Sequence, residues 1–213
     1  GFQISNHAVM RPYGVWVVIS PFNFPCALIA GPAAAAMVAG NTVVMKPSPQ
    51  TPWAARLFAE CLRDAGVPDG VFNFVTGPDE TLGQALVDSP EVDGITFTGS
   101  HDVGMMIYRR FAERKYVHPV ILEMGGKNPA IVSRNADVED AAIGIVRAAY
   151  GLQGQKCSAC SRVYVEETLH DVLLEHMVSL TSKLVVGDPT HREVYMGPLN
   201  SQKAYGAYQD YIK

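Results

Sequence analysis

The sequence has little of what marks disulfide-stabilised, nucleic-acid-binding or disordered proteins. Four cysteines among 213 residues are too few for a disulfide framework. The 17 basic residues are outnumbered by 21 acidic ones, which leaves no electrostatic case for nucleic acid or an anionic membrane as a partner. No signal peptide is recognisable at Gly1, so a cytoplasmic protein is expected. With 48% hydrophobic and 18% charged residues, the composition predicts a globular chain of one or two domains.

Charged residues are also absent from the stretch between Tyr13 and Met45. A run of this length raises the alternative of a membrane span. Pro21, Pro25 and Pro32 interrupt it, however, and would leave backbone groups without partners in lipid. A buried strand, a turn and an apolar helix explain these residues better, so we expect no membrane association.

Apolar, β-branched runs alternate with helical patterns along the first part of the chain. The expected strands are 14–20, 42–45, 71–75, 94–98 and 120–123, and the expected helices are 26–39, 52–65, 80–87 and 103–112. This alternation predicts an α/β fold with a doubly wound, Rossmann-like parallel sheet. After Gly126 the expected strands are 129–132 and 162–165 and the expected helices 141–150 and 169–184, which predicts the start of a second α/β domain.

Polar residues and glycines collect where the predicted strands end. The segments are Ser20-Pro21-Phe22-Asn23, Lys46-Pro47-Ser48, Thr98-Gly99-Ser100 and Glu123-Met124-Gly125. In doubly wound sheets, ligands bind beyond the carboxyl ends of the strands. The dinucleotide fingerprint G-x-G-x-x-G is absent. The turn at Gly99-Ser100 could face a phosphate at the start of a helix, although glycine turns before helices also serve structure alone.

Cys157 and Cys160 form a C-x-x-C pattern, which can indicate a redox pair or a zinc site. Neither the other cysteines nor the histidines complete a zinc site, so no metal is expected. We favour one reactive cysteine, Cys157, because Lys156 places a cation beside it and the polar loop before it keeps the thiol accessible. Cys26 and Cys61 are expected to be buried small residues.

Glu123 and Asn23 are candidates for acid–base and electrostatic roles. Glu123 ends an apolar strand, where we expect it to be partly shielded from water and to act as a general base. An ion pair with Lys127 is the structural alternative. Asn23 lies among prolines and phenylalanines, and an amide held there could stabilise an oxyanion or serve the turn alone.

Together these motifs resemble the aldehyde dehydrogenase family. The matching blocks, in family order, are Pro21-Phe22-Asn23-Phe24-Pro25, Gly40-Asn41-Thr42-Val43-Val44-Met45-Lys46-Pro47-Ser48, Phe97-Thr98-Gly99-Ser100, Leu122-Glu123-Met124-Gly125-Gly126-Lys127-Asn128-Pro129 and Gly154-Gln155-Lys156-Cys157. The resemblance implies NAD(P)-dependent oxidation of an aldehyde to a carboxylic acid through a cysteine thiohemiacetal and a thioester.

The resemblance also implies roles for individual residues. Cys157 would be the nucleophile, Asn23 the oxyanion donor and Glu123 the general base. Lys46 would bind the adenosine ribose, and Ser100 would lie near the pyrophosphate. The further cofactor contacts implied are Ser20, Pro21, Phe22, Ser48, Gly99 and Gly125. Family members often carry an acid three residues after that lysine, whereas Pro49 stands there in this chain. The resemblance implies NAD as the cofactor. Because the missing carboxylate would repel the 2′-phosphate of NADP, its absence leaves NADP possible as well.

Within the family, residues 154–162 look most like the 1-pyrroline-5-carboxylate (L-glutamate γ-semialdehyde) dehydrogenases of proline catabolism. In that branch, Lys156 and Ser158 would hold the substrate carboxylate. Other segments look like broader-specificity members, so another semialdehyde or a broad set of aldehydes is the alternative. The implied partner is a small-molecule aldehyde, and the whole protein is expected to form a homo-oligomer.

Family members are much longer than this chain, which resembles their middle portion. Residues 1–122 would be the NAD(P)-binding domain without its N-terminal segment, and residues 123–213 the N-terminal part of the catalytic domain with the nucleophile. The chain alone is therefore expected to be inactive. The rival hypothesis from another class is a truncated, non-catalytic polypeptide that retains the motifs, and a thiol–disulfide or zinc protein is the third.

Overall fold

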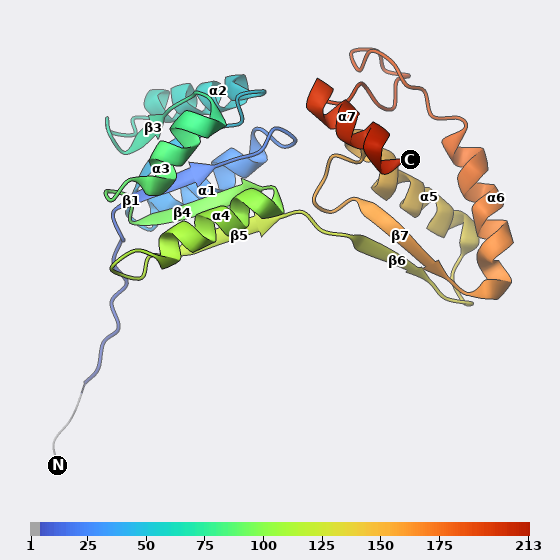
Figure 1. Cartoon of the computed structure of the whole chain (residues 1–213), viewed down its shortest axis with the longest axis horizontal. Helices are drawn as coiled ribbons and strands as arrows, with labels where there is room; N and C mark the ends of the chain where they lie inside the picture. Colours follow the sequence, from blue (N-terminus) through green and yellow to red (C-terminus); the bar gives the residue numbers. More distant parts are fainter. Residues whose placement is uncertain (1–4) are drawn as a thin grey trace. The chain divides into compact units, whose positions relative to one another are not determined.

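The computed structural model describes residues 5–213, and the chain divides into two compact units, one up to Met124 and one from Gly125. Helices and strands alternate along both units (Figure 1). None of the helices among residues 5–213 combines the length and the apolar character that crossing a bilayer requires.

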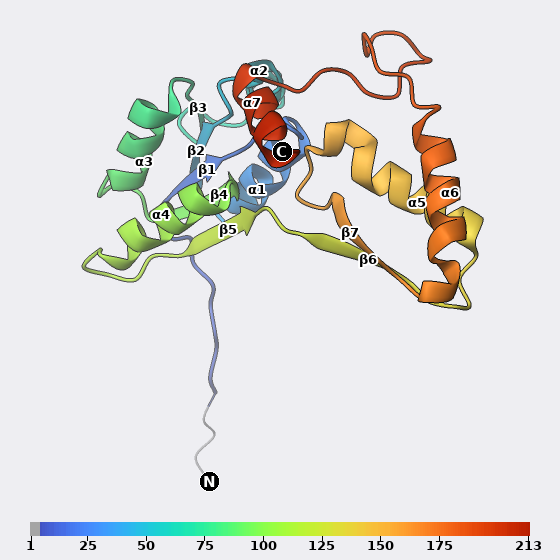
Figure 2. The same cartoon turned by 45° about the vertical axis from the view of Figure 1, so that its right-hand side comes forward.

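Five strands form the sheet of the first unit. They are β1 (Val15–Ile19), β2 (Thr42–Lys46), β3 (Phe72–Phe74), β4 (Gly94–Gly99) and β5 (Val120–Met124). All neighbouring pairs are parallel, and the order across the sheet is β3-β2-β1-β4-β5 (Figure 2). The doubly wound parallel sheet predicted from the sequence is therefore confirmed.

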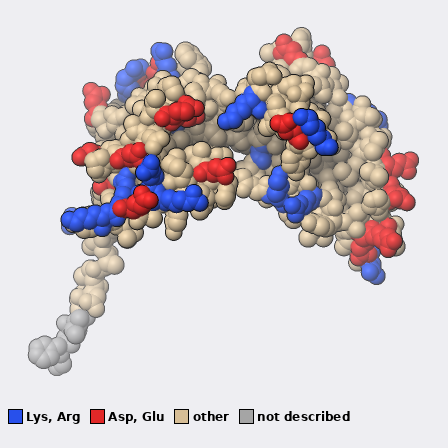
Figure 3. Space-filling model, in the orientation of Figure 1, with Lys and Arg blue, Asp and Glu red and all other residues tan. Residues whose placement is uncertain are grey.

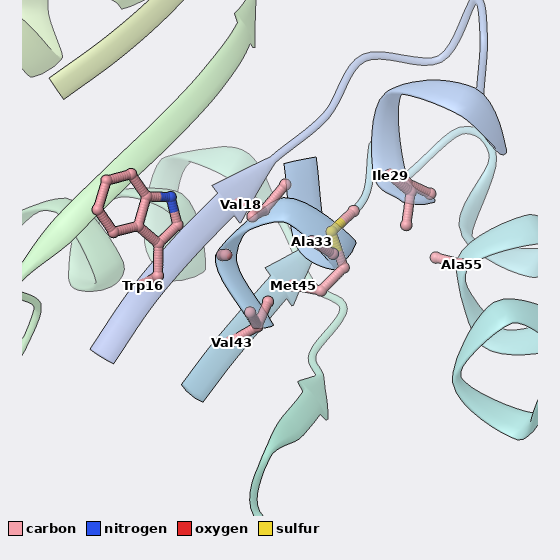
Figure 4. Packing of buried hydrophobic residues seen from close by; sticks show 8 residues of the cluster. Trp16, Val18, Ile29, Ala33, Val43, Met45 and Ala55 are labelled. Atoms are coloured by element: carbon pink, nitrogen blue, oxygen red, sulfur yellow. The ribbon is translucent and has the colours of Figure 1, made fainter. Parts of the chain in front are cut away.

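Helices cover both faces of this sheet. They are α1 (Ala27–Val38), α2 (Pro52–Asp64), a π-helical turn η1 (Asp79–Gly83) that leads into α3 (Gln84–Asp88), and α4 (His101–Ala112). Because successive strand residues point to opposite faces, Val18 packs with α1 and α2, whereas Val17 packs with α3 and α4. Figure 4 shows the first of these clusters, with Ala33 of α1 close to Met45 of β2.

The central strand β1 is joined to β4 through Trp16. The indole nitrogen of Trp16 donates a buried hydrogen bond of 2.9 Å to the hydroxyl of Thr96. The ring lies against Gly94, where a Cβ atom would collide with the ring carbons. A residue without a side chain is therefore needed at position 94.

The second unit is built around two parallel strands, β6 (Asn128–Val132) and β7 (Cys160–Val165). Its other elements are α5 (Val138–Tyr150), the 3₁₀ turns η2 (Gly151–Gly154) and η3 (Glu167–Leu169), α6 (His170–Thr181) and α7 (Gln202–Tyr211). Val132, Ala142, Ile145 and Leu173 form its core. The acidic start predicted for α5 is confirmed, because the Asp137 carboxylate accepts hydrogen bonds of 3.0 Å from the backbone N–H groups of two residues in the first turn.

The expectation that Cys26 and Cys61 are buried is wrong, because both are exposed. Cys26 precedes α1 and lies outside the buried stripe of that helix. The buried side of α2 is marked by Ala55, and Cys61, six residues further on, falls on another side at about 100° per residue.

Candidate active site

β1 and β4 lie side by side at the point where the winding of the first sheet reverses, and ligands of such sheets bind beyond this edge. Ser20, which follows β1, is only 3% exposed, and its hydroxyl has no hydrogen-bond partner among the described residues. A buried hydroxyl in this state fits a polar ligand that supplies the missing partner. Pro21 and Phe22 come next along the chain and are half-buried.

The turn between β4 and α4 brings a helix start to the same edge of the sheet. Gly99 ends β4, and the hydroxyl of Ser100 accepts a hydrogen bond of 3.4 Å from the backbone N–H of Val103. The helix packs closely on the sheet, since a Cβ atom at Gly104 would lie 2.5 Å from the sulfur of Met124. The backbone N–H groups of this helix start fit the phosphates of a nucleotide.

Lys46 ends β2, and its side chain is buried. Its ammonium group forms an ion pair with the carboxylate of Asp79, the first residue of η1, and donates a hydrogen bond of 3.4 Å to the carbonyl of Pro47. The Asp79 side chain is 65% exposed. Asp79 was not predicted from the sequence, because this contact joins residues 33 positions apart and no local pattern marks it. Ser48, also a predicted cofactor contact, is half-buried.

An open, largely apolar hollow of about 580 Å³ lies on the α1 side of the first sheet, and Leu28, Pro32, Ile121 and Glu123 are among its lining residues. Glu123 is exposed, so the predicted shielding of its carboxylate from water is wrong for the described chain. The reason is that β5 is an edge strand, and Ile121 and Glu123 project from the same side of it. A carboxylate at the rim of an apolar hollow can act as a base on a molecule held there.

Asn23 lies in the turn between β1 and α1. It is half-buried, and its amide oxygen is shielded from solvent. Enclosure of one end of the amide restricts its orientation, which is what a fixed donor to an oxyanion requires.

The second unit carries Cys157 in the loop between α5 and β7. The Cys157 and Ser158 side chains are exposed, Lys156 is half-buried, and all four cysteines of the chain are free thiols. Upstream of Cys157, Leu152 and Gln153 have φ values of 56° and 58°. Such left-handed backbone is costly for residues other than glycine and occurs often at functional sites.

Asn128, the first residue of β6, is hydrogen-bonded to this loop. Its amide nitrogen donates a hydrogen bond of 2.6 Å to the carbonyl of Cys157, and an irregularity in the β6–β7 pairing follows immediately after it. Asn128 is therefore a positioning residue for the Cys157 backbone. No role was predicted for Asn128 from the sequence, where its place directly before the expected strand 129–132 was the only signal.

The predicted site residues divide between the two units. Asn23, Lys46, Ser100 and Glu123 belong to the first, whereas Lys156, Cys157 and Ser158 belong to the second, together with Gly125. Those of the first unit lie in the last residues of strands or in the turns that follow them, and those of the second lie in the loops before β6 and β7. Figure 3 shows acidic and basic side chains interspersed on the surface it presents, as expected from a nearly balanced composition.

The sequence profile of the aldehyde dehydrogenase family matches residues 3–213. The chain belongs to the aldehyde dehydrogenase family. Its five-stranded parallel sheet matches aldehyde dehydrogenase structures.

Individual relatives in this family are similar over nearly the whole chain. A 1-pyrroline-5-carboxylate dehydrogenase of Geobacillus sp. (strain WCH70) is 48% identical over 216 residues, which cover 98% of this chain and 41% of that protein. Among solved structures, the NAD-dependent aldehyde dehydrogenase from Sinorhizobium meliloti has a TM-score of 0.91 and 39% identity, covering 95% of this chain and 40% of that one. A proline utilization A (PutA) structure has a TM-score of 0.92 and 36% identity over 94% of this chain and 21% of that one. The chain thus spans about two-fifths of the length of the curated relatives it matches.

Proposed function

We propose that this chain provides the cofactor-binding part and the nucleophile of an NAD(P)-dependent aldehyde dehydrogenase that oxidises L-glutamate γ-semialdehyde to glutamate. The observation that carries the proposal is the 48% identity to 1-pyrroline-5-carboxylate dehydrogenases over 98% of the chain, which spans both Glu123 and Cys157. In this proposal residues 1–122 bind the cofactor, residues 123–213 begin the catalytic domain, and the whole protein is a homo-oligomer.

Cys157 acts as the nucleophile in this scheme. Its thiolate adds to the aldehyde carbon, so that a C–S bond forms and the carbonyl oxygen takes the negative charge. The amide of Asn23 and the backbone N–H of Cys157 donate hydrogen bonds to that oxygen. Asn128 supports this step indirectly, because it fixes the carbonyl of the same residue at 2.6 Å.

The chemistry that NAD(P)⁺ would supply when bound is a hydride acceptor; loss of the hydride from the former aldehyde carbon leaves a thioester on Cys157. Ser20, Lys46, Ser48 and Ser100 would hold that cofactor, with Pro21, Phe22, Gly99 and Gly125 lining it. Glu123 then removes a proton from water, the hydroxide attacks the thioester carbon, and the thiolate leaves as the carboxylic acid forms.

Substrate choice is assigned to Lys156 and Ser158, which flank the nucleophile with a cation and a hydroxyl. A carboxylate-bearing aldehyde gains a charge-assisted hydrogen bond from such a pair, whereas an uncharged aldehyde does not. A broad-specificity dehydrogenase, or a polypeptide without turnover, remains the competing function.

The decisive experiment compares kcat/KM for L-glutamate γ-semialdehyde with that for an uncharged aliphatic aldehyde of similar length, using the full-length protein. We expect the semialdehyde to be preferred, and Lys156→Met to lower its kcat/KM by about 10- to 100-fold, the effect of losing one charged hydrogen bond. Lys127→Met, which removes an exposed cation from the same unit, is the control and should leave the preference intact. Preference for the uncharged aldehyde would contradict the assigned substrate.

A further inference from the structure

Asp79 is the one carboxylate paired with Lys46 among the ion pairs of the described residues. The pair has a definite direction: the Lys46 side chain is 1% exposed, whereas that of Asp79 is 65% exposed. The ammonium group of Lys46 therefore lies in the protein interior, and the carboxylate of Asp79 lies at the surface. A ligand that approaches this end of β2 meets the carboxylate before it meets the ammonium group.

We propose that Asp79 makes the cofactor site selective for NAD⁺ over NADP⁺; this rests on the proposed function, in which Lys46 binds the adenosine ribose. The two cofactors differ only at the ribose 2′ position, which carries a hydroxyl in NAD⁺ and a phosphate in NADP⁺. A hydroxyl can donate a hydrogen bond to the Asp79 carboxylate, as acidic residues of dinucleotide sites do.

A 2′-phosphate, in contrast, is disfavoured beside the Asp79 carboxylate. It carries a charge of about −1.5 to −2 at neutral pH, as phosphate monoesters do, and the outward-facing Asp79 repels it. Lys46 cannot compensate while its ammonium group is already neutralised by Asp79. The phosphate could use Lys46 only by displacing the carboxylate, and breaking a pair whose cation is buried is costly.

Asp79 supplies the carboxylate that the residue at position 49 does not. Proline at position 49 removes the acid that often follows the ribose-binding lysine in this family. Asp79 comes from η1, a different segment of the chain, and brings a carboxylate to the same lysine. The backbone supports this approach, because Gly83 at the end of η1 lies over the Lys46 side chain, with a Cβ position 3.8 Å from its Cε.

The test measures binding of NAD⁺ and of NADP⁺ separately, by calorimetry, to the full-length protein and to its Asp79→Asn variant. Asparagine keeps an oxygen that can accept from Lys46 and removes the negative charge. The unmodified protein should bind NAD⁺ more tightly. In the variant, the ratio of the NADP⁺ and NAD⁺ dissociation constants should fall by about tenfold or more, because a like charge beside the phosphate has been removed.

Glu80→Gln is the matched control, since Glu80 is the next residue of η1, is exposed, and carries the same charge. It should change the ratio little. If Asp79→Asn destabilises the protein, both dissociation constants rise by the same factor, because each is divided by the fraction of folded protein. The ratio therefore reports the role of Asp79 even in a partly unfolded sample.

The outcomes separate this proposal from the proposed function. A preference for NAD⁺ that Asp79→Asn leaves unchanged, or shares with Glu80→Gln, overturns the role of Asp79 while the dehydrogenase assignment stands. A preference for NADP⁺ in the unmodified protein also overturns it. Binding of neither nucleotide would contradict the proposed function itself.

Discussion

Cys157 and Cys160 are close in the sequence, but the structure gives them different surroundings. Cys157 is exposed in a loop, whereas Cys160 begins β7, is half-buried and packs against the core of the second unit. The thiol of Cys160 donates a hydrogen bond of 3.4 Å to the carbonyl of Arg162. These contacts indicate a structural role for Cys160 and leave Cys157 as the accessible thiol of this pair.

We expect Cys157→Ala to lower aldehyde oxidation by the full-length protein by more than about a thousandfold, since no other group replaces a missing nucleophile. Cys160→Ala should retain most of the activity and lose some stability. Formation of reduced nicotinamide under saturating aldehyde is the measurement. Equal losses in the two variants would favour a mechanism that uses both cysteines.

The carboxylate of Asp188 makes a pH-dependent contribution to the stability of its turn. Its carboxylate accepts hydrogen bonds of 2.9 Å from the backbone N–H and of 2.8 Å from the hydroxyl of Thr190. These bonds hold the pKa of Asp188 below its ordinary value, the backbone bond contributing most. The stabilisation of this turn is therefore present above the ordinary pKa and is lost as the pH falls through the lowered one.

Replacement of Thr190 by valine should raise the pKa of Asp188 part of the way back, because the hydroxyl is lost and the backbone N–H remains. An NMR titration of the Asp188 carboxyl group measures this shift. An unchanged pKa in Thr190→Val would mean that the hydroxyl contributes nothing to holding the charge.

At the scale of whole elements, the contact between β1 and β4 depends on a position without a side chain. Trp16 occupies the space where a Cβ atom of Gly94 would lie, and an aromatic ring held by a buried hydrogen bond to Thr96 cannot easily move away.

Gly94→Ala should therefore lower the free energy of unfolding of the first unit by about 1–3 kcal/mol, the usual cost of overpacking a core. Gly144→Ala is the control, because Gly144 lies inside α5 with open space around its Cβ position. It should stabilise its helix by about 0.5–1 kcal/mol. Urea denaturation of the two variants measures both effects, and equal destabilisation would show that Trp16 does not restrict position 94.

The elements were largely predictable from the sequence because their signals are local. Valine and isoleucine mark β1, valine marks β2, and Asp137 marks the start of α5. Contacts between distant segments were not predictable: neither the ion pair of Lys46 with Asp79 nor the hydrogen bond of Asn128 to Cys157 leaves a pattern along the chain. The exposure of Glu123 was missed because a strand's apolar residues do not reveal that it lies at the edge of its sheet.

At the scale of the whole molecule, the activity of the chain by itself depends on how much of the enzyme it contains. The curated relatives are more than twice as long as the part of them that this chain matches. We expect the 213-residue chain alone to show little or no dehydrogenase activity. Reacting atoms must be held near attack distance, and a displacement of about 1 Å can cost on the order of 100-fold in rate.

The test assays the purified chain with NAD⁺ and several aldehydes beside the full-length protein. A kcat/KM close to that of the full-length protein would show that these residues form a complete enzyme. Circular dichroism of the purified chain serves as the control that its helices and strands have formed.

The position of β1 at the centre of the first sheet has a consequence for biosynthesis. One neighbour of β1 is β2, the next strand made, but the other is β4, and the hydrogen bond from Trp16 to Thr96 spans 80 residues. At about 5–20 residues per second on the ribosome, roughly 4–16 seconds pass between the two residues. During that interval the nascent chain carries an apolar strand with one open edge, the type of surface that chaperones protect. The same strand order that brings β1 and β4 together at the candidate cofactor edge thus leaves the growing polypeptide open to aggregation until β4 has left the ribosome.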